Sequence, residues 1–278
     1  MKKISRRSFL AAAGLSVAAL ALTACGGSAS SVASSVASSA SSAAASTSAA
    51  AGELTTVEAG KLTMATNATF PPYEMTTDAG EFEGIDIETA QAIADKLGLE
   101  LQIDDMDFDA ALLSVQQGKA DIVMAGVTVT DERKAVMDFS DSYATGIQSI
   151  IVPEGSDIAS PDDLAGKKIG TQRGTTGYIY CTDDFGEDAV VAYDSGLTAV
   201  QALKNGQVDA VVIDNAPAQE FVAANPGLKV LDTSYAEEDY AIGMAKGSAL
   251  EDAVNKALEE LKADGTLQSI VDKYINAN

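Results

Sequence analysis

Two residues of opposite charge, Arg133 and Asp214, each follow an apolar segment typical of a buried strand. Arg133 ends the run Ala125-Gly-Val-Thr-Val-Thr-Asp-Glu-Arg, which leaves a predicted strand and enters a helix at Thr130. An arginine guanidinium is the preferred bidentate partner of a carboxylate. Asp214 follows Ala210-Val-Val-Ile213, and its carboxylate can accept hydrogen bonds from an ammonium group. The pair therefore suits a zwitterionic ligand.

A third segment, Gln172-Arg-Gly-Thr-Thr-Gly177, also follows a predicted strand and opens a helix, whose free backbone N–H groups suit an anion. Each piece has a simpler interpretation that the sequence leaves open. Arg133 could form a surface ion pair with Asp131 or Glu132, Asp214 could cap the next helix, and the Gly-Thr-Thr run could be a turn. Their joint placement at the ends of corresponding strands favours the binding site.

Other kinds of chemistry are poorly represented. The chain contains no histidine, which removes Ser-His-Asp and Cys-His nucleophilic systems and most zinc sites. The spacing Asp105-x-Asp107-x-Asp109 resembles a calcium loop, but Ala110 and Gln116 stand where Gly and Glu are needed. Lys167 is followed by Lys168, so no phosphate-binding Gly-Lys-Ser/Thr loop is present. We expect no metal, no cofactor and no enzymatic activity.

The first residues resemble a processing signal. A basic start is followed by an apolar stretch from Phe9 to Leu22, which is too short for a permanent membrane span. It ends in Leu22-Thr-Ala-Cys25, which resembles a bacterial lipobox and predicts a signal peptide over residues 1–24 with Cys25 acylated. An ordinary secretory signal with a chance Cys is the alternative. The segment Ser5-Arg-Arg-Ser-Phe-Leu10 leaves the twin-arginine and Sec export routes both open.

Residues 25–56 are predicted to form a flexible tether after the Cys, because the stretch from Gly26 to Ala51 is almost entirely Ser and Ala. Four of the 18 basic residues lie in the signal, which leaves 14 against 41 acidic residues. This acidic balance argues against nucleic acid and against docking on anionic lipid. With Cys25 acylated, Cys181 has no disulfide partner and is expected to be a small buried apolar residue.

The elements that must position these residues alternate between strand and helix. The first set comprises strands at Lys61–Thr66, Leu99–Ile103 and Asp121–Ala125 and helices at Asp86–Leu97 and Asp107–Gln117. The second set has strands at Gln148–Val152, Lys168–Thr171, Val190–Tyr193, Asp209–Ile213, Lys229–Leu231 and Tyr240–Ala245, with helices at Thr175–Cys181, Leu197–Lys204, Asn215–Ala224, Leu250–Lys262 and Leu267–Tyr274. Two such sets predict two α/β lobes. Ligands bind at the carboxyl ends of such strands, so we expect a site between the lobes.

From about Lys61 to Tyr274 the sequence resembles the polar amino acid substrate-binding proteins of ABC importers, also called family 3 extracellular solute-binding proteins. The most specific parts are Ala125–Lys134 and Asp138-Phe-Ser-Asp-Ser-Tyr143. Ala65–Tyr73 and Gly84-Ile-Asp-Ile-Glu88 also match, whereas Thr89 departs from the apolar residue that the family pattern expects.

The resemblance implies roles for individual residues. Arg133 and Thr128 would hold the ligand's α-carboxylate with help from Gly126 and Thr176, and Asp214 would bind the α-ammonium. Phe70 and Phe108 would pack on the ligand. Asn67 and Gln172 would read its side chain. An Asp is common where Asn67 stands, so a cationic side chain is not expected, because a buried cation without a nearby anion is costly. An acidic side chain would need a second cation, for which only Arg173 is available. A neutral polar amino acid is the resulting prediction.

The resemblance also implies a periplasmic-binding-protein type II fold, with two open sheets, flanking helices and two crossings between lobes. The larger lobe would comprise residues 57–144 and 241–278 and the smaller lobe residues 145–240, with the hinge near Thr145 and Asp239. The protein would act as a monomer outside the cell membrane, held by its lipid, and would deliver a free amino acid to an ABC permease and ATPase. A periplasmic dehydratase-like enzyme, with Glu81, Glu83 or Asp214 as its acid or base, and a sensory ligand-binding module are the alternatives.

Overall fold

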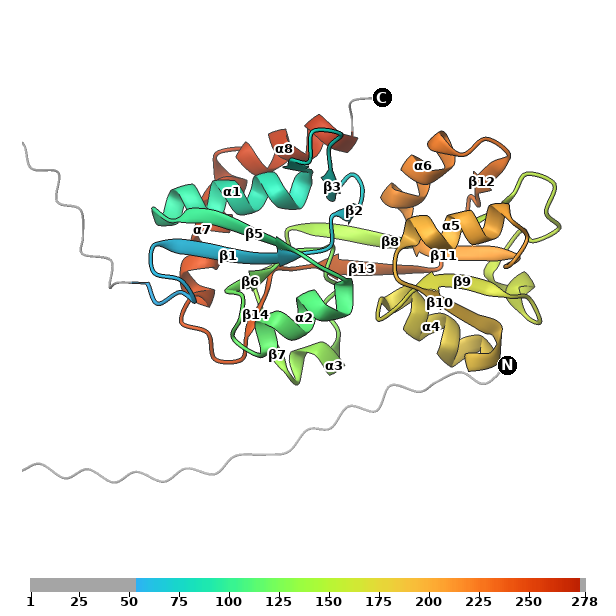
Figure 1. The fold of residues 1–278 in the computed structure, drawn as a ribbon, viewed down its shortest axis with the longest axis horizontal. Coiled ribbons are helices and arrows are strands. Elements are labelled where there is room, and N and C mark those ends of the chain that lie inside the picture. The colour runs from blue at the N-terminus through green and yellow to red at the C-terminus, as the bar shows by residue number, and fades with distance from the viewer. Residues whose placement is uncertain (1–53, 276–278) are drawn as a thin grey trace, which may run out of the picture. The chain divides into compact units, whose positions relative to one another are not determined.

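The computed structural model describes residues 54–275, and the predicted signal, Cys25 and most of the tether lie outside this range. Two sheets dominate, each with helices on both faces (Figure 1). We define the first lobe as the sheet β5-β1-β6-β14-β7 with its helices, and the second lobe as the sheet β10-β9-β11-β8-β12 with its helices. The predicted fold class, with two open sheets and flanking helices, is confirmed. Within residues 54–275, no helix is long and apolar enough to cross a bilayer.

Three parallel strands form the centre of the first lobe. Its strands are β1 (Lys61–Thr66), β5 (Glu100–Asp105), β6 (Ile122–Val123), β7 (Met137–Phe139) and β14 (Gly243–Ala245). The strands β5, β1 and β6 are parallel, whereas β14 runs antiparallel to β6 and β7. A small antiparallel sheet, β2 (Thr69–Phe70), β3 (Glu74–Thr76) and β4 (Phe82–Glu83), follows β1 directly. This small sheet is not predicted from the sequence, because its strands are only two or three residues long.

The helices of the first lobe bury apolar faces against this sheet. On one face lie α1 (Ile85–Leu97), α7 (Glu251–Ala263) and α8 (Thr266–Ile275), and on the other lie α2 (Phe108–Gln116) and the short α3 (Asp131–Lys134) (Figure 1). Helix α1 ends at Gly98, whose φ of 70° is the left-handed conformation of a helix C-cap. Its buried residues, including Ile85, Ala90 and Ile93, recur at helical spacing as predicted.

The second lobe repeats the arrangement with one long strand. It contains β8 (Ala144–Pro153), β9 (Ile169–Gln172), β10 (Val190–Tyr193), β11 (Ala210–Asp214), β12 (Leu228–Val230) and β13 (Ala236–Tyr240). Helices α5 (Gly196–Lys204) and α6 (Asn215–Ala224) cover one face, and α4 (Thr176–Phe185) covers the other (Figure 1). The 3₁₀ turns η1 (Pro161–Leu164) and η2 (Glu187–Ala189) lie in connections. Cys181 lies on the buried face of α4, as expected for a small buried apolar residue.

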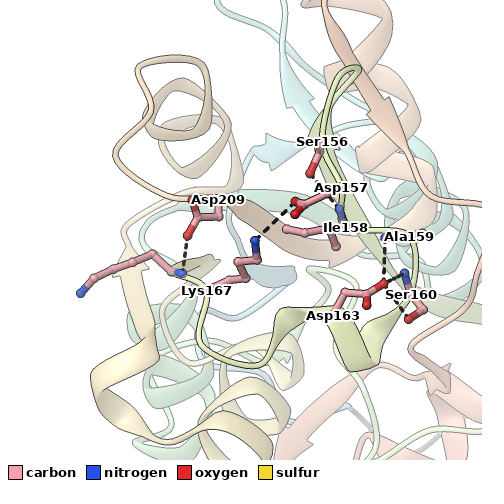
Figure 2. A network of polar contacts seen from close by, with 9 residues as sticks. Ser156, Asp157, Ile158, Ala159, Ser160, Asp163, Lys167 and Asp209 are labelled. Carbon is pink, nitrogen blue, oxygen red and sulfur yellow. Dashed lines mark hydrogen bonds and ion pairs between the residues drawn. The ribbon is translucent and has the colours of Figure 1, made fainter.

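A network of polar contacts holds the start of β9 in place (Figure 2). Asp163 Oδ2 accepts hydrogen bonds from the backbone of Ala159 at 3.0 Å and of Ser160 at 2.9 Å, which completes a capping box for η1. The Lys168 N–H donates to Asp209 Oδ2 at 2.7 Å. Since Lys168 precedes β9 and Asp209 precedes β11, this bond aligns the two strands that end at Gln172 and Asp214.

The chain passes between the sheets along two paired strands. Strand β8 pairs antiparallel with β13, and Thr145 lies opposite Asp239, the two positions at which the hinge is predicted (Figure 1). A single strand over Tyr240–Ala245 was predicted, and this is wrong. Strand β13 ends at Tyr240 and β14 begins at Gly243, because the chain leaves one sheet and joins the other between them. Alternation of apolar residues is similar on both sides of such a change, so periodicity alone does not reveal it.

Candidate functional site

A single cavity brings together all nine residues that the sequence analysis assigned to ligand binding. They are Asn67, Phe70, Phe108, Gly126, Thr128, Arg133, Gln172, Thr176 and Asp214, and each lines the same pocket. Four of them lie at or just beyond the carboxyl ends of parallel strands: Asn67 after β1, Gly126 after β6, and Gln172 and Asp214 at the last positions of β9 and β11. Strand ends from both sheets therefore meet at one place, as expected for sheets of this kind.

Arg133 is placed in the cavity by the short helix α3. Thr130 caps this helix, since its side chain accepts a hydrogen bond from the backbone N–H of Arg133 at 3.2 Å. The guanidinium is 9% exposed, donates from Nη1 to the Thr128 carbonyl at 2.8 Å, and lies over the Phe108 ring at 5.4 Å. Burial lowers the pKa of the Arg133 guanidinium from its ordinary value, although not enough to remove its charge. A surface ion pair with Asp131 or Glu132 is therefore not the role of Arg133.

Arg133 also reaches the opposite lobe. Its Nη2 donates to the Gly174 carbonyl at 3.1 Å, and Gly174 lies between β9 and α4 of the second lobe. Two of its five N–H donors are thus used by backbone carbonyls, and the others remain for a ligand. The guanidinium is the kind of group that would receive a carboxylate between the lobes.

Asp214 stands at the end of β11 with its carboxylate turned away from helix α6. It occupies the N-cap position of α6, but its side chain makes no capping hydrogen bond. Instead Oδ2 accepts from Gln148 Nε2 at 2.8 Å and Oδ1 accepts from the Tyr240 hydroxyl. Burial raises the pKa of Asp214 to about 7, although the bonds from Tyr240 and Gln148 oppose this rise. A buried carboxylate without a cationic partner is costly, so Asp214 is suited to receive an ammonium group.

The two threonines predicted to assist carboxylate binding come from opposite lobes. Thr128 Oγ1 and Thr176 Oγ1 lie 3.4 Å apart, and both are buried. Thr176 is the first residue of α4, whose N-cap Thr175 accepts from the Tyr178 N–H. Backbone N–H groups at this helix start have no helical partner and would suit an anion.

Asn67 and Gln172 face each other across the cleft. Gln172 Nε2 donates to Asn67 Oδ1 at 2.9 Å, and Asn67 Nδ2 donates to the Met106 carbonyl at 2.9 Å. Phe70 and Phe108 supply buried apolar walls. Gly126 allows Phe70 to approach, because a Cβ at Gly126 would lie 2.8 Å from its ring, and the φ of Gly126 is 55°.

Glu74 is a cavity residue that the sequence analysis missed. It follows the matched segment Ala65–Tyr73 by one position, and an acid inside an apolar segment is the signal that could have identified it. Its side chain lines the cavity, is fully buried, and has no hydrogen bond partner for either oxygen among the described residues. Burial, followed by the charge of neighbouring Asp86, raises the pKa of Glu74 well above its ordinary value. The surroundings of Glu74 therefore disfavour its ionised form.

The remaining cavity residues that were not predicted are Ala125, Thr175, Val212 and Ile213, which are sequence neighbours of predicted ones. Arg173, considered as a second cation, does not line this cavity. It forms an exposed ion pair with Asp194 at 3.8 Å. Among residues 54–275, no group of three or more potential metal ligands is assembled.

Comparison with known proteins gives a consistent picture. The sequence profile of the bacterial extracellular solute-binding proteins, family 3, matches residues 62–277. The L-cystine-binding protein TcyJ of Escherichia coli K12 is 34% identical over 226 residues, covering 80% of this chain and 85% of its own.

Solved structures agree with this match. The arginine-, lysine-, histidine-binding protein ArtJ of Geobacillus stearothermophilus superposes with a TM-score of 0.75 at 34% identity, covering 78% of this chain and 96% of that one. An ancestral arginine-binding protein bound to glutamine also has a TM-score of 0.75, at 44% identity over 78% of this chain and 98% of its own.

Proposed function

This chain belongs to the bacterial extracellular solute-binding proteins of family 3, and we propose that it captures a free amino acid in the cavity between its lobes for an ABC importer. The observation that carries this proposal is the pairing of a buried Arg133 in the first lobe with a buried Asp214 in the second, around one cavity. Arg133 would bind the α-carboxylate with Gly126, Thr128 and Thr176, and Asp214 would bind the α-ammonium. The family and its relatives are solute-binding proteins and not enzymes. They give no support to the dehydratase-like or sensory alternatives.

Capture would proceed by closure of the lobes about the paired strands β8 and β13. Contacts across the cleft, such as those of Arg133 with Gly174 and of Gln172 with Asn67, join the two lobes, and opening of the lobes would break them. We propose that the lobes comprise residues 57–144 with 241–278 and residues 145–240. Binding energy from a ligand that touches both lobes would favour the closed form. Micromolar capture needs about 8 kcal/mol, which several hydrogen bonds to charged groups at about 1.5–3 kcal/mol each can supply.

The proposed ligand is an amino acid with a neutral polar side chain. The Asn67–Gln172 pair offers uncharged donors and acceptors, as a carboxamide requires. The ancestral arginine-binding protein bound to glutamine supports this class, whereas an ancestral arginine-binding protein bound to arginine and the basic ligands named for ArtJ support a cationic ligand as the competing class. A thermal-shift panel of the twenty standard amino acids and L-cystine tests the proposal, since a ligand at about 100 times its Kd adds about 2.7 kcal/mol of stability. No shift with any of them would overturn amino acid capture.

Replacing Asn67 with Asp is expected to shift preference toward cationic ligands. The new carboxylate would lie in the buried part of the cavity beside Gln172, where it can pair with a guanidinium or ammonium group. We expect the ratio of arginine affinity to glutamine affinity to rise at least about tenfold, as one charge-assisted hydrogen bond allows. Calorimetry with both amino acids measures this ratio. Asn205→Asp, an exposed position at the end of α5, is the matched control and should leave the ratio unchanged.

We also propose that the protein is a monomer held to the outer face of the cell membrane by acylated Cys25. The support is the sequence Leu22-Thr-Ala-Cys25 and the Ser/Ala-rich segment after it. Cys25→Ser should move the protein from the membrane fraction to the soluble fraction and abolish labelling with radioactive palmitate. Membrane retention with undiminished labelling of the Cys25→Ser protein would contradict the anchor.

A further inference from the structure

The face of the hinge that looks into the site carries three polar residues with no role assigned so far. Strands β8 and β13 pair so that Gly146 lies opposite Glu238, Gln148 opposite Ala236, and Ala144 opposite Tyr240. Alternate residues of a strand share a face, and so do residues directly opposite. Gln148, Glu238 and Tyr240 therefore share one face of the ribbon, and they are 1%, 6% and 0% exposed.

Gly146 shapes this face for Tyr240. A Cβ at Gly146 would lie 2.4–2.5 Å from the ring and hydroxyl of Tyr240, so the ring lies flat across the glycine. The Tyr73 ring packs edge-on against Tyr240 at 5.3 Å and limits its movement from the other side. The Tyr240 hydroxyl is thereby aimed in one direction, toward Asp214.

Both oxygens of Asp214 are held by this face. Tyr240 donates to Oδ1, and Gln148 Nε2 donates to Oδ2 at 2.8 Å. The strands that carry these donors are the ones about which the lobes would rotate. Asp214 itself ends the central strand β11 of the second lobe, next to β8.

Glu238 connects the same face to the two threonines proposed to bind the ligand's α-carboxylate. Its Oε2 accepts from Thr128 Oγ1 at 3.1 Å, from Thr176 Oγ1 at 2.9 Å and from Gln148 Nε2 at 3.0 Å. Thr128 and Thr176 belong to different lobes, so one hinge carboxylate joins a hydroxyl from each. Its charge also favours the cationic form of buried Arg133.

We propose that Gln148 and Tyr240 are positioning residues that aim the Asp214 carboxylate at the ligand's ammonium group from the hinge itself. This inference rests on the proposed function and adds two residues, neither of which lines the cavity, to its machinery. A ligand that binds Asp214 is thereby connected to both β8 and β13 through these two hydrogen bonds. Ligand binding and the hinge angle are then coupled without intermediate elements.

The proposal predicts a particular dependence on pH. The groups whose charges act on Asp214 or respond to it are Tyr240, Glu238, Tyr73, Glu74 and Arg133. Only Tyr240 and Gln148 donate side-chain hydrogen bonds that lower its pKa, which burial raises to about 7. Removing either donor raises that pKa further, so a larger share of Asp214 is protonated at neutral pH. An ammonium group binds the ionised form, and affinity lost at neutral pH should return as the pH rises.

The experiment measures Kd by calorimetry between pH 6 and 8.5 for the full chain and for Tyr240→Phe and Gln148→Ala. The probe is the amino acid that gives the largest thermal shift with the unsubstituted protein. Each variant is expected to bind about tenfold more weakly at pH 7, as loss of one hydrogen bond to a charged group predicts, and to recover most of the loss by pH 8.5. In an Asp214→Asn background, Tyr240→Phe should change the remaining affinity less than about twofold, since the two residues act together.

Tyr143→Phe is the matched control. Tyr143 is a buried tyrosine that donates to a buried aspartate, Asp86, at 2.8 Å, but neither residue lines the cavity. The Tyr143→Phe variant should bind the amino acid as tightly as the unsubstituted protein across the pH range. Unchanged affinity in Tyr240→Phe and Gln148→Ala, or a loss equal at every pH, would overturn the proposal. Tyr240→Phe removes a single atom and decides the question if Gln148→Ala does not fold. Absence of any thermal shift with the unsubstituted protein would instead contradict the proposed function.

Discussion

Arg133→Ala is expected to abolish amino acid binding with little loss of fold. The variant removes the one buried guanidinium that lines the cavity, together with its hydrogen bond across the cleft to the Gly174 carbonyl. Loss of two or more charge-assisted hydrogen bonds at about 1.5–3 kcal/mol each predicts a fall in affinity of at least about a hundredfold. Arg133 lies on the four-residue helix α3, outside both sheets, so the melting temperature without ligand should change by only a few degrees.

Arg173→Ala is the control for this experiment. Arg173 lies in the same loop as Gly174, but its side chain is 56% exposed and pairs with Asp194 at 3.8 Å outside the cavity. An exposed ion pair of this kind contributes little to the free energy of folding. Calorimetry should therefore show unchanged affinity for Arg173→Ala and no measurable binding for Arg133→Ala. Unchanged affinity in the Arg133 variant would contradict the assigned site.

Gly174→Ala is expected to weaken binding by about tenfold. A Cβ at Gly174 would lie 1.6 Å from Asp109 Oδ1, so the exposed Asp109 side chain must rotate away or the loop must shift. Asp109 belongs to α2 of the first lobe and Gly174 to the second, so this contact lies across the cleft. A shift of the loop would also displace the Gly174 carbonyl, which accepts a hydrogen bond from Arg133. Loss of that one hydrogen bond to a charged group predicts an effect of about this size, which calorimetry measures.

Two further variants separate the clash from backbone strain. Gly174 has a φ of 74°, which costs any other residue about 1–2 kcal/mol. Gly166 in the same lobe has a φ of 77°, but a Cβ there would meet no atom within 4 Å. Gly166→Ala should lose stability to a similar degree and keep its affinity. Asp109→Ala added to Gly174→Ala removes the clashing atoms and should restore binding. Equal loss of affinity in Gly166→Ala, or no recovery of affinity in the double variant, would show that the contact between Gly174 and Asp109 is not the cause.

Local sequence signals account for much of the fold. Gly98 ends α1 in the left-handed conformation, Thr130 caps α3, and the apolar run before Asp214 is a buried strand. These features depend on neighbours only a few residues away, which is why sequence patterns predict them. The signal fails where the chain changes sheets, as between Tyr240 and Gly243, since both sides are equally apolar.

The site was predictable to the extent that its residues follow strands. Arg133 and Asp214 stand out because charged residues follow apolar runs, and family resemblance supplied Phe70, Phe108 and the Asn67–Gln172 pair. Glu74 and Glu238 were missed. Glu74 lies inside an apolar segment, which is a weak signal, whereas Glu238 stands in the acidic run Glu237-Glu-Asp239, where nothing separates it from its neighbours.

The sequence by itself determined the residue types at the strand ends, the likeness of the first 25 residues to a lipoprotein signal, and the family. Only the tertiary structure decided which residues face each other. The pairing of β8 with β13 places Gln148, Tyr240 and Glu238 within hydrogen-bonding distance of Asp214, Thr128 and Thr176. The approach of the two lobes brings Asp109 against Gly174. The residues joined by these hydrogen bonds are 26 to 110 positions apart in the sequence. Such contacts depend on the register of strands from both lobes, and no local pattern of residues carries that information.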